Sequence, residues 1–335
     1  MAHIPLLGLI ESSVLFLVNV DLERKIGIDG NIKIKLPIVI GGLGSTAIAK
    51  NNWEGLAIGA AITGIPLTIG ENVCGMDPGA KIVNGHVVHS PELERRVKLY
   101  KEWQQDGYGI IIVQTNIEDT ELNVDEYAIS QLGIEAIELK WGQGAKDIGG
   151  EVMIENLDRA RMLKDRGYVL IPDPDSPAVA EAFKQGKFKE FERHSRVGMI
   201  TEEGFMARVE ELRQRGAKYI SLKTGAYRPA DLARALKFCS KAKVDFLTID
   251  SAGGGTGMSP WRMMNEWGIP GVYLWSLAFR FAERLAAEGE HIPDIGFASG
   301  FAFEDQIFKG LALGAPYVKF ITMARAPLAV PSSTK

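Results

Sequence analysis

Short apolar runs alternate with helical patterns eight times along this chain, and this alternation restricts the folds that it can adopt. The helical pattern of residues 45–64, for example, begins at a Ser45 or Thr46 cap and ends at Gly64. Strands that alternate with helices are typical of a parallel sheet, and eight such units predict an α/β fold, a closed (β/α)8 TIM barrel. The eight predicted strands are residues 35–42, 65–70, 108–115, 134–142, 217–225, 244–250, 292–300 and 315–323.

A long section between the fourth and fifth predicted strands interrupts the alternation. It contains two predicted helices, residues 154–167 and 176–195, and an apolar run, residues 168–172, that prolines and aspartates end. We interpret this section as an insertion between strands 4 and 5. If residues 168–172 joined the main sheet, nine strands would favour an open doubly wound sheet instead.

The first 34 residues precede the alternation and form an N-terminal extension, whereas residues 35–335 are expected to be one barrel domain. Glu11, Ser12 and Ser13 interrupt the apolar stretch of residues 4–18, and no positive charge precedes it. We therefore expect neither a membrane span nor a signal peptide. The extension is expected to pack on the barrel or on a partner, and an apolar face left exposed would favour a homo-oligomer.

Charge and cysteine content exclude several classes of protein. The net charge is −4 and no basic block occurs, which argues against nucleic acid or an anionic membrane surface as a partner. Cys74 and Cys239 are too few for a disulfide framework, a four-cysteine zinc site or a cysteine-held iron–sulfur cluster within this chain. The histidines show no metal-ligand spacing, so no metal site is predicted. A cytoplasmic location is expected.

Glycine and polar residues gather after the predicted strands, where a barrel carries its active site. The stretch "TIDSAGGGTGMSP", residues 248–260, is neither a Rossmann nor a Walker loop. It is either a turn that needs glycine or a set of backbone amides suited to an anionic or planar ligand. Lys223 follows Ser221 at a barrel-facing spacing in strand 5. A lysine there needs an anionic partner, either a ligand or a carboxylate such as Asp250 or Glu138.

Three of these segments resemble one family. They are "IELKWGQGAKDIGGE", "YISLKTGAY" and "DFLTIDSAGGGTGMSP", and they are similar to the FMN-binding domain of glutamate synthase and its stand-alone relatives. The resemblance runs from about Pro37 to Ala326. It implies a barrel enzyme, an FMN-dependent oxidoreductase that acts on CH–NH2 donors.

The resemblance also implies positions for the cofactor. The flavin ring would lie across the strand ends, with Lys223 at its N1/O2 edge and the phosphate between the loops after strands 7 and 8. The implied cofactor-binding residues are Gly41, Gly42, Ser45, Gln143, Lys223, Gly253, Gly254, Gly255, Thr256, Ser299, Gly300, Thr322 and Met323.

In the family reaction, reduced FMN delivers hydride to 2-iminoglutarate, which forms from 2-oxoglutarate and ammonia, and the product is glutamate. The resemblance therefore implies a small-molecule substrate of the 2-oxoglutarate or amino-acid class. Lys140, Lys146 and Arg325 are the candidate carboxylate-binding residues. Glu71 is a candidate acid/base group or an ion-pair partner of these lysines, so Lys223, Glu71 and Lys140 form the candidate catalytic set.

The sequence also departs from the family. It begins Met-Ala-His rather than with a catalytic cysteine, and it has no cysteines after strand 8, so separate glutaminase and electron-transfer subunits are expected. Ile321 stands where a glycine is expected near the phosphate. Two alternatives therefore stay open. One is a flavin-free or regulatory barrel subunit of a glutamate-synthase-like complex, and the other is a different reduced-FMN barrel such as an isopentenyl-diphosphate-isomerase-like enzyme.

Overall fold

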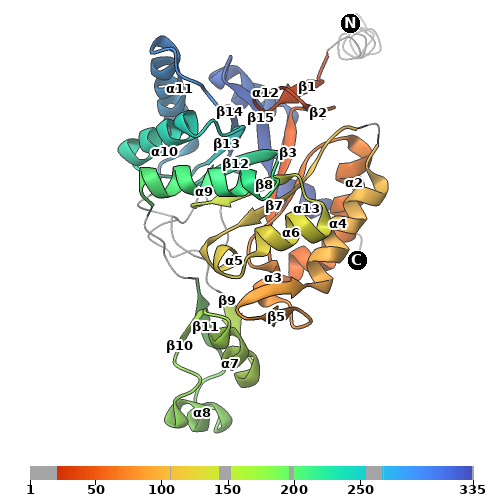
Figure 1. Cartoon of the computed structure of the whole chain (residues 1–335), viewed down its shortest axis with the longest axis vertical. Helices are drawn as coiled ribbons and strands as arrows, with labels where there is room; N and C mark the ends of the chain where they lie inside the picture. Colours follow the sequence, from red (N-terminus) through yellow and green to blue (C-terminus); the bar gives the residue numbers. More distant parts are fainter. Residues whose placement is uncertain are drawn as a thin grey trace, which may run out of the picture.

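Eight parallel strands close into a barrel in the computed structural model, which describes residues 21–105, 107–142, 152–195, 200–253, 266 and 268–333 (Figure 1). Each barrel strand overlaps one predicted strand, so the predicted (β/α)8 fold is confirmed. In the order in which they pair around the barrel, the strands are β12 (Tyr219–Thr224), β13 (Phe246–Asp250), β14 (Asp294–Ala298), β15 (Val318–Met323), β3 (Ile38–Leu43), β4 (Leu67–Ile69), β7 (Ile111–Thr115) and β8 (Ala136–Lys140).

Helices surround the barrel, and their ends carry the capping signals that the sequence shows. The Thr46 side chain accepts a hydrogen bond from the Ala49 amide, and Gly64 ends the helix in the left-handed conformation. The surrounding helices are α2 (Ala47–Thr63), α4 (Pro91–Trp103), α6 (Val124–Leu132), α9 (Glu202–Gln214), α10 (Pro229–Lys241), α11 (Gly271–Ala287), α12 (Glu304–Gly314) and α13 (Arg325–Ser333). The connections between them also contain two short helices, α3 (Val73–Met76) and α5 (Ile117–Glu121), and the hairpin of β5 (Lys81–Val83) and β6 (His86–His89).

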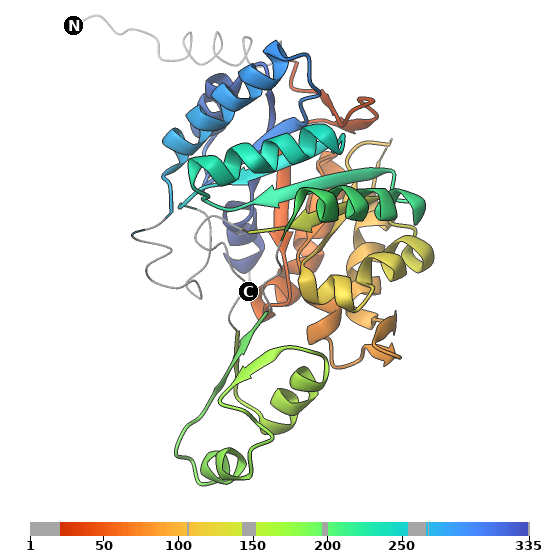
Figure 2. The ribbon, with the colours of Figure 1, turned by 60° about the vertical axis from the view of Figure 1, so that its left-hand side comes forward.

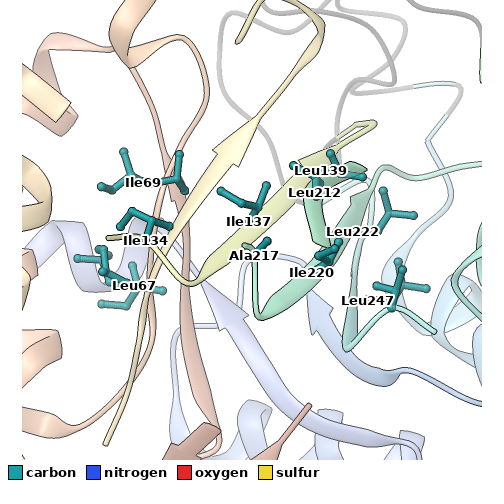
Figure 3. Close-up of a cluster of buried hydrophobic side chains, with 14 of the residues drawn as sticks. Leu67, Ile69, Ile134, Ile137, Leu139, Leu212, Ala217, Ile220, Leu222 and Leu247 are labelled. Atoms are coloured by element: carbon teal, nitrogen blue, oxygen red, sulfur yellow. The ribbon is translucent and has the colours of Figure 1, made fainter. Parts of the chain in front are cut away.

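The main core lies between the barrel and the helices. Outward side chains of β4, β8, β12 and β13 pack there with residues of α9 and its following loop (Figure 3). Strands buried on both faces need apolar side chains outside as well as inside, which is why these runs are almost continuously apolar. The labelled members are Leu67, Ile69, Ile134, Ile137, Leu139, Leu212, Ala217, Ile220, Leu222 and Leu247.

The hairpin of β1 (Arg24–Ile26) and β2 (Ile32–Ile34) closes the N-terminal end of the barrel. Its isoleucines pack against the inward side chains at that end, which include Phe246 and Phe320. The hairpin turn is fixed to the barrel because the Gly27 amide donates to Asp294 Oδ2 at 2.9 Å. Ligands therefore reach the barrel interior from its other end. The predicted boundary between the extension and the barrel domain stays a prediction.

The predicted insertion between strands 4 and 5 forms its own small layer beyond the C-terminal ends of the barrel strands (Figures 1 and 2). It contains β9 (Val152–Ile154), α7 (Leu157–Asp165), β10 (Val169–Ile171), α8 (Pro177–Lys184) and β11 (Phe191–His194), and the three strands pair in the order β10-β11-β9.

The prediction of one helix over residues 176–195 is wrong. The helix α8 ends at Lys184, and Gly186 follows with a φ of 70° in the left-handed region. The remaining segment pairs with β9 and β10 as strand β11. No helix in the described ranges is long and apolar enough to cross a membrane.

Candidate functional site

The barrel interior changes from apolar to polar toward the C-terminal ends of the strands. Ile112, Ala136 and Phe246 lie at the N-terminal end, and side chains two or four residues further along the same strands are polar because strand residues alternate between faces. The buried inward polar residues toward the C-terminal ends include Gln114, Glu138, Ser221, Lys223, Thr248, Asp250 and Thr322.

We call this polar C-terminal end of the barrel interior the barrel mouth. Gln114 and Glu138 form a polar pair deep in the mouth. Nε2 of Gln114 donates to Oε1 of Glu138 at 2.5 Å, and Glu138 is 3% exposed. Burial raises the pKa of Glu138, and the nearby Lys223 opposes this rise. A Cβ on Gly42 would lie 2.8 Å from Gln114 Oε1, so only glycine lets the β3 backbone approach this amide.

Lys223 is buried beside a carboxylate but makes no hydrogen bond with it. Its Nζ lies 3.7 Å from Oδ2 of Asp250, and their side chains are 8% and 7% exposed. Oδ1 of Asp250 has no hydrogen-bond partner among the described residues. The ammonium group therefore has a counter-charge within reach while its donors stay available to a polar or anionic ligand.

Glu71 and Lys140 come from different strands and meet as an ion pair. Glu71 follows β4 and Lys140 ends β8, and Lys140 Nζ lies 2.7 Å from Glu71 Oε1. Their side chains are 18% and 9% exposed, so the pair is largely shielded from water. The backbone beside Glu71 is closely packed, since a Cβ on Gly44 would lie 2.5 Å from the Glu71 carbonyl oxygen.

The loops after β13, β14 and β15 converge on a second part of the mouth. Arg325 Nη2 donates to the Gly253 carbonyl at 2.9 Å, and Ser299 and Ser251 share a hydrogen bond between their hydroxyls. Gly300 has a φ of 68°, and a Cβ there would lie 3.8 Å from Arg325 Nη2. An arginine, a hydroxyl and a glycine turn are thereby gathered at one point.

Ile321 does not project into this part of the mouth. It is fully buried, and its Cδ1 would lie 2.8 Å from a Cβ on Gly310 of α12. The neighbouring Thr322 faces inward instead, with its Cγ2 2.8 Å from a Cβ on Gly41. Strand alternation directs Ile321 toward the helix layer, so its side chain does not occupy this point of the site.

The remaining sequence-derived candidates divide into described and undescribed residues. Ser45 is half-buried in the loop after β3, and Met323 is buried in the core between the barrel and the helices. Those outside the described residues are Gln143, Lys146, Gly254, Gly255 and Thr256.

Sequence reasoning left Gln114 out of the candidate site and gave Glu138 and Asp250 only as partners of Lys223. Their signal is a polar residue at alternate positions of an otherwise apolar strand, as in "IIVQT" and "IELK". Within the described ranges, no group of three or more His, Cys, Asp or Glu side chains could hold a metal ion.

Comparison with known proteins finds one family model and one curated relative that are similar to part of this chain. A family model described as "Conserved region in glutamate synthase" matches residues 193–329. The glutamate synthase large subunit-like protein YerD of Bacillus subtilis (strain 168) is 29% identical over 192 residues, which are 55% of this chain. That match spans only 32% of the relative's length.

Solved structures share the fold at low sequence identity. A flavocytochrome b2 variant with sulfite bound has a TM-score of 0.54 at 13% identity, over 93% of this chain and 62% of that chain. Mandelate oxidase with (S)-2-phenylpropionate has a TM-score of 0.51 at 15% identity, over 94% of this chain and 72% of that chain. The family match and the YerD relative confirm the resemblance predicted from the sequence: this (β/α)8 barrel is similar to the conserved region of glutamate synthase over residues 193–329.

Proposed function

We propose that this chain is an FMN-dependent oxidoreductase that reductively aminates 2-oxoglutarate or a related oxo acid. The observation that carries the proposal is Lys223, a buried ammonium group that faces the barrel mouth without a hydrogen bond from the described residues. A buried cation of this kind, whose neighbouring carboxylate Asp250 makes no hydrogen bond to it, can stabilise a ligand that is anionic or becomes anionic during the reaction.

The residues of the mouth fit a flavin. Gln114 Oε1, Asp250 Oδ1 and Thr322 Oγ1 are buried without hydrogen-bond partners in the described part of the chain. Gly41 and Gly42 have no side chains that would separate the β3 backbone from Thr322 and Gln114. A flat ring edged by N–H donors and carbonyl acceptors would satisfy such atoms, and the isoalloxazine ring has these edges.

When bound, FMN supplies hydride transfer, which side chains alone cannot perform. In this proposal Lys223 stabilises negative charge at the N1/O2 edge of the ring. Arg325, Ser299 and Gly300 bind the phosphate, because a guanidinium and a glycine turn suit an anion. The remaining proposed contacts come from Gly41, Gly42, Ser45, Gln143, Gly253, Gly254, Gly255, Thr256, Thr322 and Met323.

The Glu71–Lys140 pair is proposed to receive the substrate. A substrate carboxylate would compete with Glu71 for Lys140, and Lys146 would bind the rest of its negative charge. Arg325, a substrate-binding candidate from the sequence, lies beside Gly253 and Gly300 and is assigned to the phosphate instead. Glu71, once displaced, can hold a proton for the imine nitrogen. In this assignment Lys140 binds the substrate carboxylate, and its ion-pair partner Glu71 acts as the acid/base group.

The electron donor and the ammonia source are proposed to lie outside residues 1–335, because Cys74 and Cys239 are too few to hold an iron–sulfur cluster within these residues. The flavin-free alternative gains no support from Ile321, since that side chain packs under α12. The isopentenyl-diphosphate-isomerase-like alternative has no specific observation in its favour.

The visible spectrum of the purified protein tests the cofactor. Flavin absorbance, or stoichiometric uptake of added FMN, is expected, and a colourless protein that takes up no FMN would refute the proposal. Anaerobic reoxidation of the reduced protein by 2-oxoglutarate with ammonia then tests the substrate. If neither 2-oxoglutarate nor another oxo acid reoxidises the reduced protein in the presence of ammonia, the proposed reductive amination is refuted and only FMN binding remains.

A further inference from the structure

The insertion contacts the loop that carries Glu71 through Tyr168, a buried residue at the start of β10. The Tyr168 hydroxyl donates to Oδ1 of Asn72 at 2.9 Å. Asn72 directly follows Glu71 and has a φ of 66°, in the left-handed region. We propose that Tyr168 is a positioning residue that holds Glu71 in its ion pair with Lys140. The insertion then contributes to the geometry of the site.

Four hydrogen bonds hold Asn72 within the described residues, and only the one from Tyr168 comes from the insertion; another runs from the Met76 amide to the Asn72 carbonyl at 3.0 Å. Its amide donates to Oδ2 of Asp119 at 2.9 Å, and its Oδ1 also accepts from Asn116 Nδ2 at 3.2 Å. Asp119 is buried in the first turn of α5, where its carboxylate also accepts from the amide of the N-cap residue Asn116. The unusual backbone conformation at Asn72 is thus maintained by the insertion on one side and the β7 loop on the other.

The backbone of Glu71 also has no room to shift toward β3. Gly70 donates its amide to the Leu43 carbonyl at 3.1 Å, and a Cβ on Gly70 would lie 2.5 Å from the Gly44 nitrogen. The backbone of Glu71 is therefore held between β3 and Asn72. The position of its carboxylate against Lys140 depends on both contacts.

The insertion is firmly attached at this point. Arg166 Nη1 donates to the carbonyls of Gly75 at 2.6 Å and Asp77 at 2.9 Å, at the end of α3. Arg159 Nη2 donates to the Met76 carbonyl at 3.3 Å. A Cβ on Gly75 would lie 2.0 Å from the Tyr168 hydroxyl, so a glycine is needed for the ring to enter. Because these contacts attach the insertion to α3, the Tyr168 hydroxyl is held at a fixed position next to Asn72.

The test measures the reactivity of Lys140 in the full chain as purified, and it needs neither substrate nor turnover. Acetylation of lysines by an N-hydroxysuccinimide ester is followed by peptide mass spectrometry, with exposed Lys98 as the internal reference. We expect Tyr168→Phe, which keeps the ring over Arg193 at 4.8 Å, to raise the acetylation rate of Lys140 about three- to tenfold, as one lost hydrogen bond allows. Glu71→Gln, which removes the ion-pair partner, gives the highest acetylation rate expected for Lys140.

Tyr100→Phe is the matched control. Tyr100 is also fully buried, and its hydroxyl donates to the Ile65 carbonyl at 2.8 Å, away from Glu71. It should lose similar stability and leave the acetylation of Lys140 within about twofold of the wild type. Equal acetylation of Lys140 in Tyr168→Phe and Tyr100→Phe would overturn the inference.

A second variant covers the case in which Tyr168→Phe fails to fold. Asn72→Gly removes the acceptor of the Tyr168 hydroxyl while glycine tolerates the left-handed backbone, and it should also raise Lys140 acetylation. The inference rests on the proposed function only for the role of the ion pair. A changed acetylation rate in a protein that binds no FMN would refute the proposed function alone, and an unchanged rate in a flavoprotein would refute this inference alone.

Discussion

Gln114 and Glu138 share a 2.5 Å hydrogen bond in the middle of the barrel, while the other half of the Gln114 amide lies against the Gly42 backbone. One side chain thus connects the buried carboxyl group to the strand that lines the mouth. The amide cannot move aside without breaking the hydrogen bond to Glu138. This relationship makes Gly42 a sensitive position.

Gly42→Ala is expected to destabilise the protein by about 1–3 kcal/mol, because its Cβ would meet Gln114 Oε1 at 2.8 Å. Gly59→Ala is the matched control, since nothing lies within 4 Å of a Cβ at this position of α2. That variant should gain about 0.5–1 kcal/mol from helix propensity. Urea unfolding measures both, and equal effects of the same sign would contradict the assigned packing.

Lys223→Met should weaken FMN binding by about ten- to a hundredfold, since a charged hydrogen bond contributes about 1.5–3 kcal/mol. Asp250 would then be a buried charge without its cation, so the variant is also made in an Asp250→Asn background. Fluorescence titration of the apoprotein with FMN measures the dissociation constant. Unchanged affinity in both backgrounds would exclude Lys223 from the flavin site.

Thr322→Val and Ile321→Val separate the two faces of β15. Thr322 faces the mouth, so loss of its hydroxyl should weaken FMN binding several-fold. Ile321 packs on α12, so loss of one methyl group should cost about 0.5–1.5 kcal/mol of stability and leave FMN affinity unchanged. The opposite pattern in titration and unfolding experiments would mean that the register of β15 is different.

Asp294 makes the stability depend on pH. Burial raises its pKa to about 6 from 3.8, so the folded state binds a proton more tightly than the unfolded state. Its contribution to stability is therefore present at acidic pH and is lost as the pH rises from about 4 to about 6. Asp294→Asn should flatten this part of the curve of unfolding free energy against pH. An unchanged slope would show that the carboxyl group titrates normally.

Most of the barrel could be predicted because its signals are local. Caps such as Thr46 and Ser90 and the length of each apolar run lie within one segment of sequence. The strands β1, β2 and β9–β11 are only three or four residues long, and their partners are set by tertiary contacts. Residues 191–194 read as helix until β9 and β10 are present to pair with them.

The site was less accessible from sequence because its members meet only after the barrel closes. Glu71 and Lys140 are both visible as charges after strands, but their 2.7 Å contact depends on the relative register of β4, β7 and β8. The direction of Ile321 likewise follows from the register of β15 with β3. A family pattern shows which residue types occur, whereas the pairing of strands decides which of them face one another.

The hairpin under the barrel also has a kinetic consequence. With Ile26, Ile32 and Ile34 filling the N-terminal end, everything that enters the barrel shares one entrance. Lys223 and Lys140 are partners in the register of β12 and β8, so a molecule bound at either one lies across this entrance. Release of a molecule from Lys223 is therefore slowed whenever a second molecule is bound at Glu71 and Lys140.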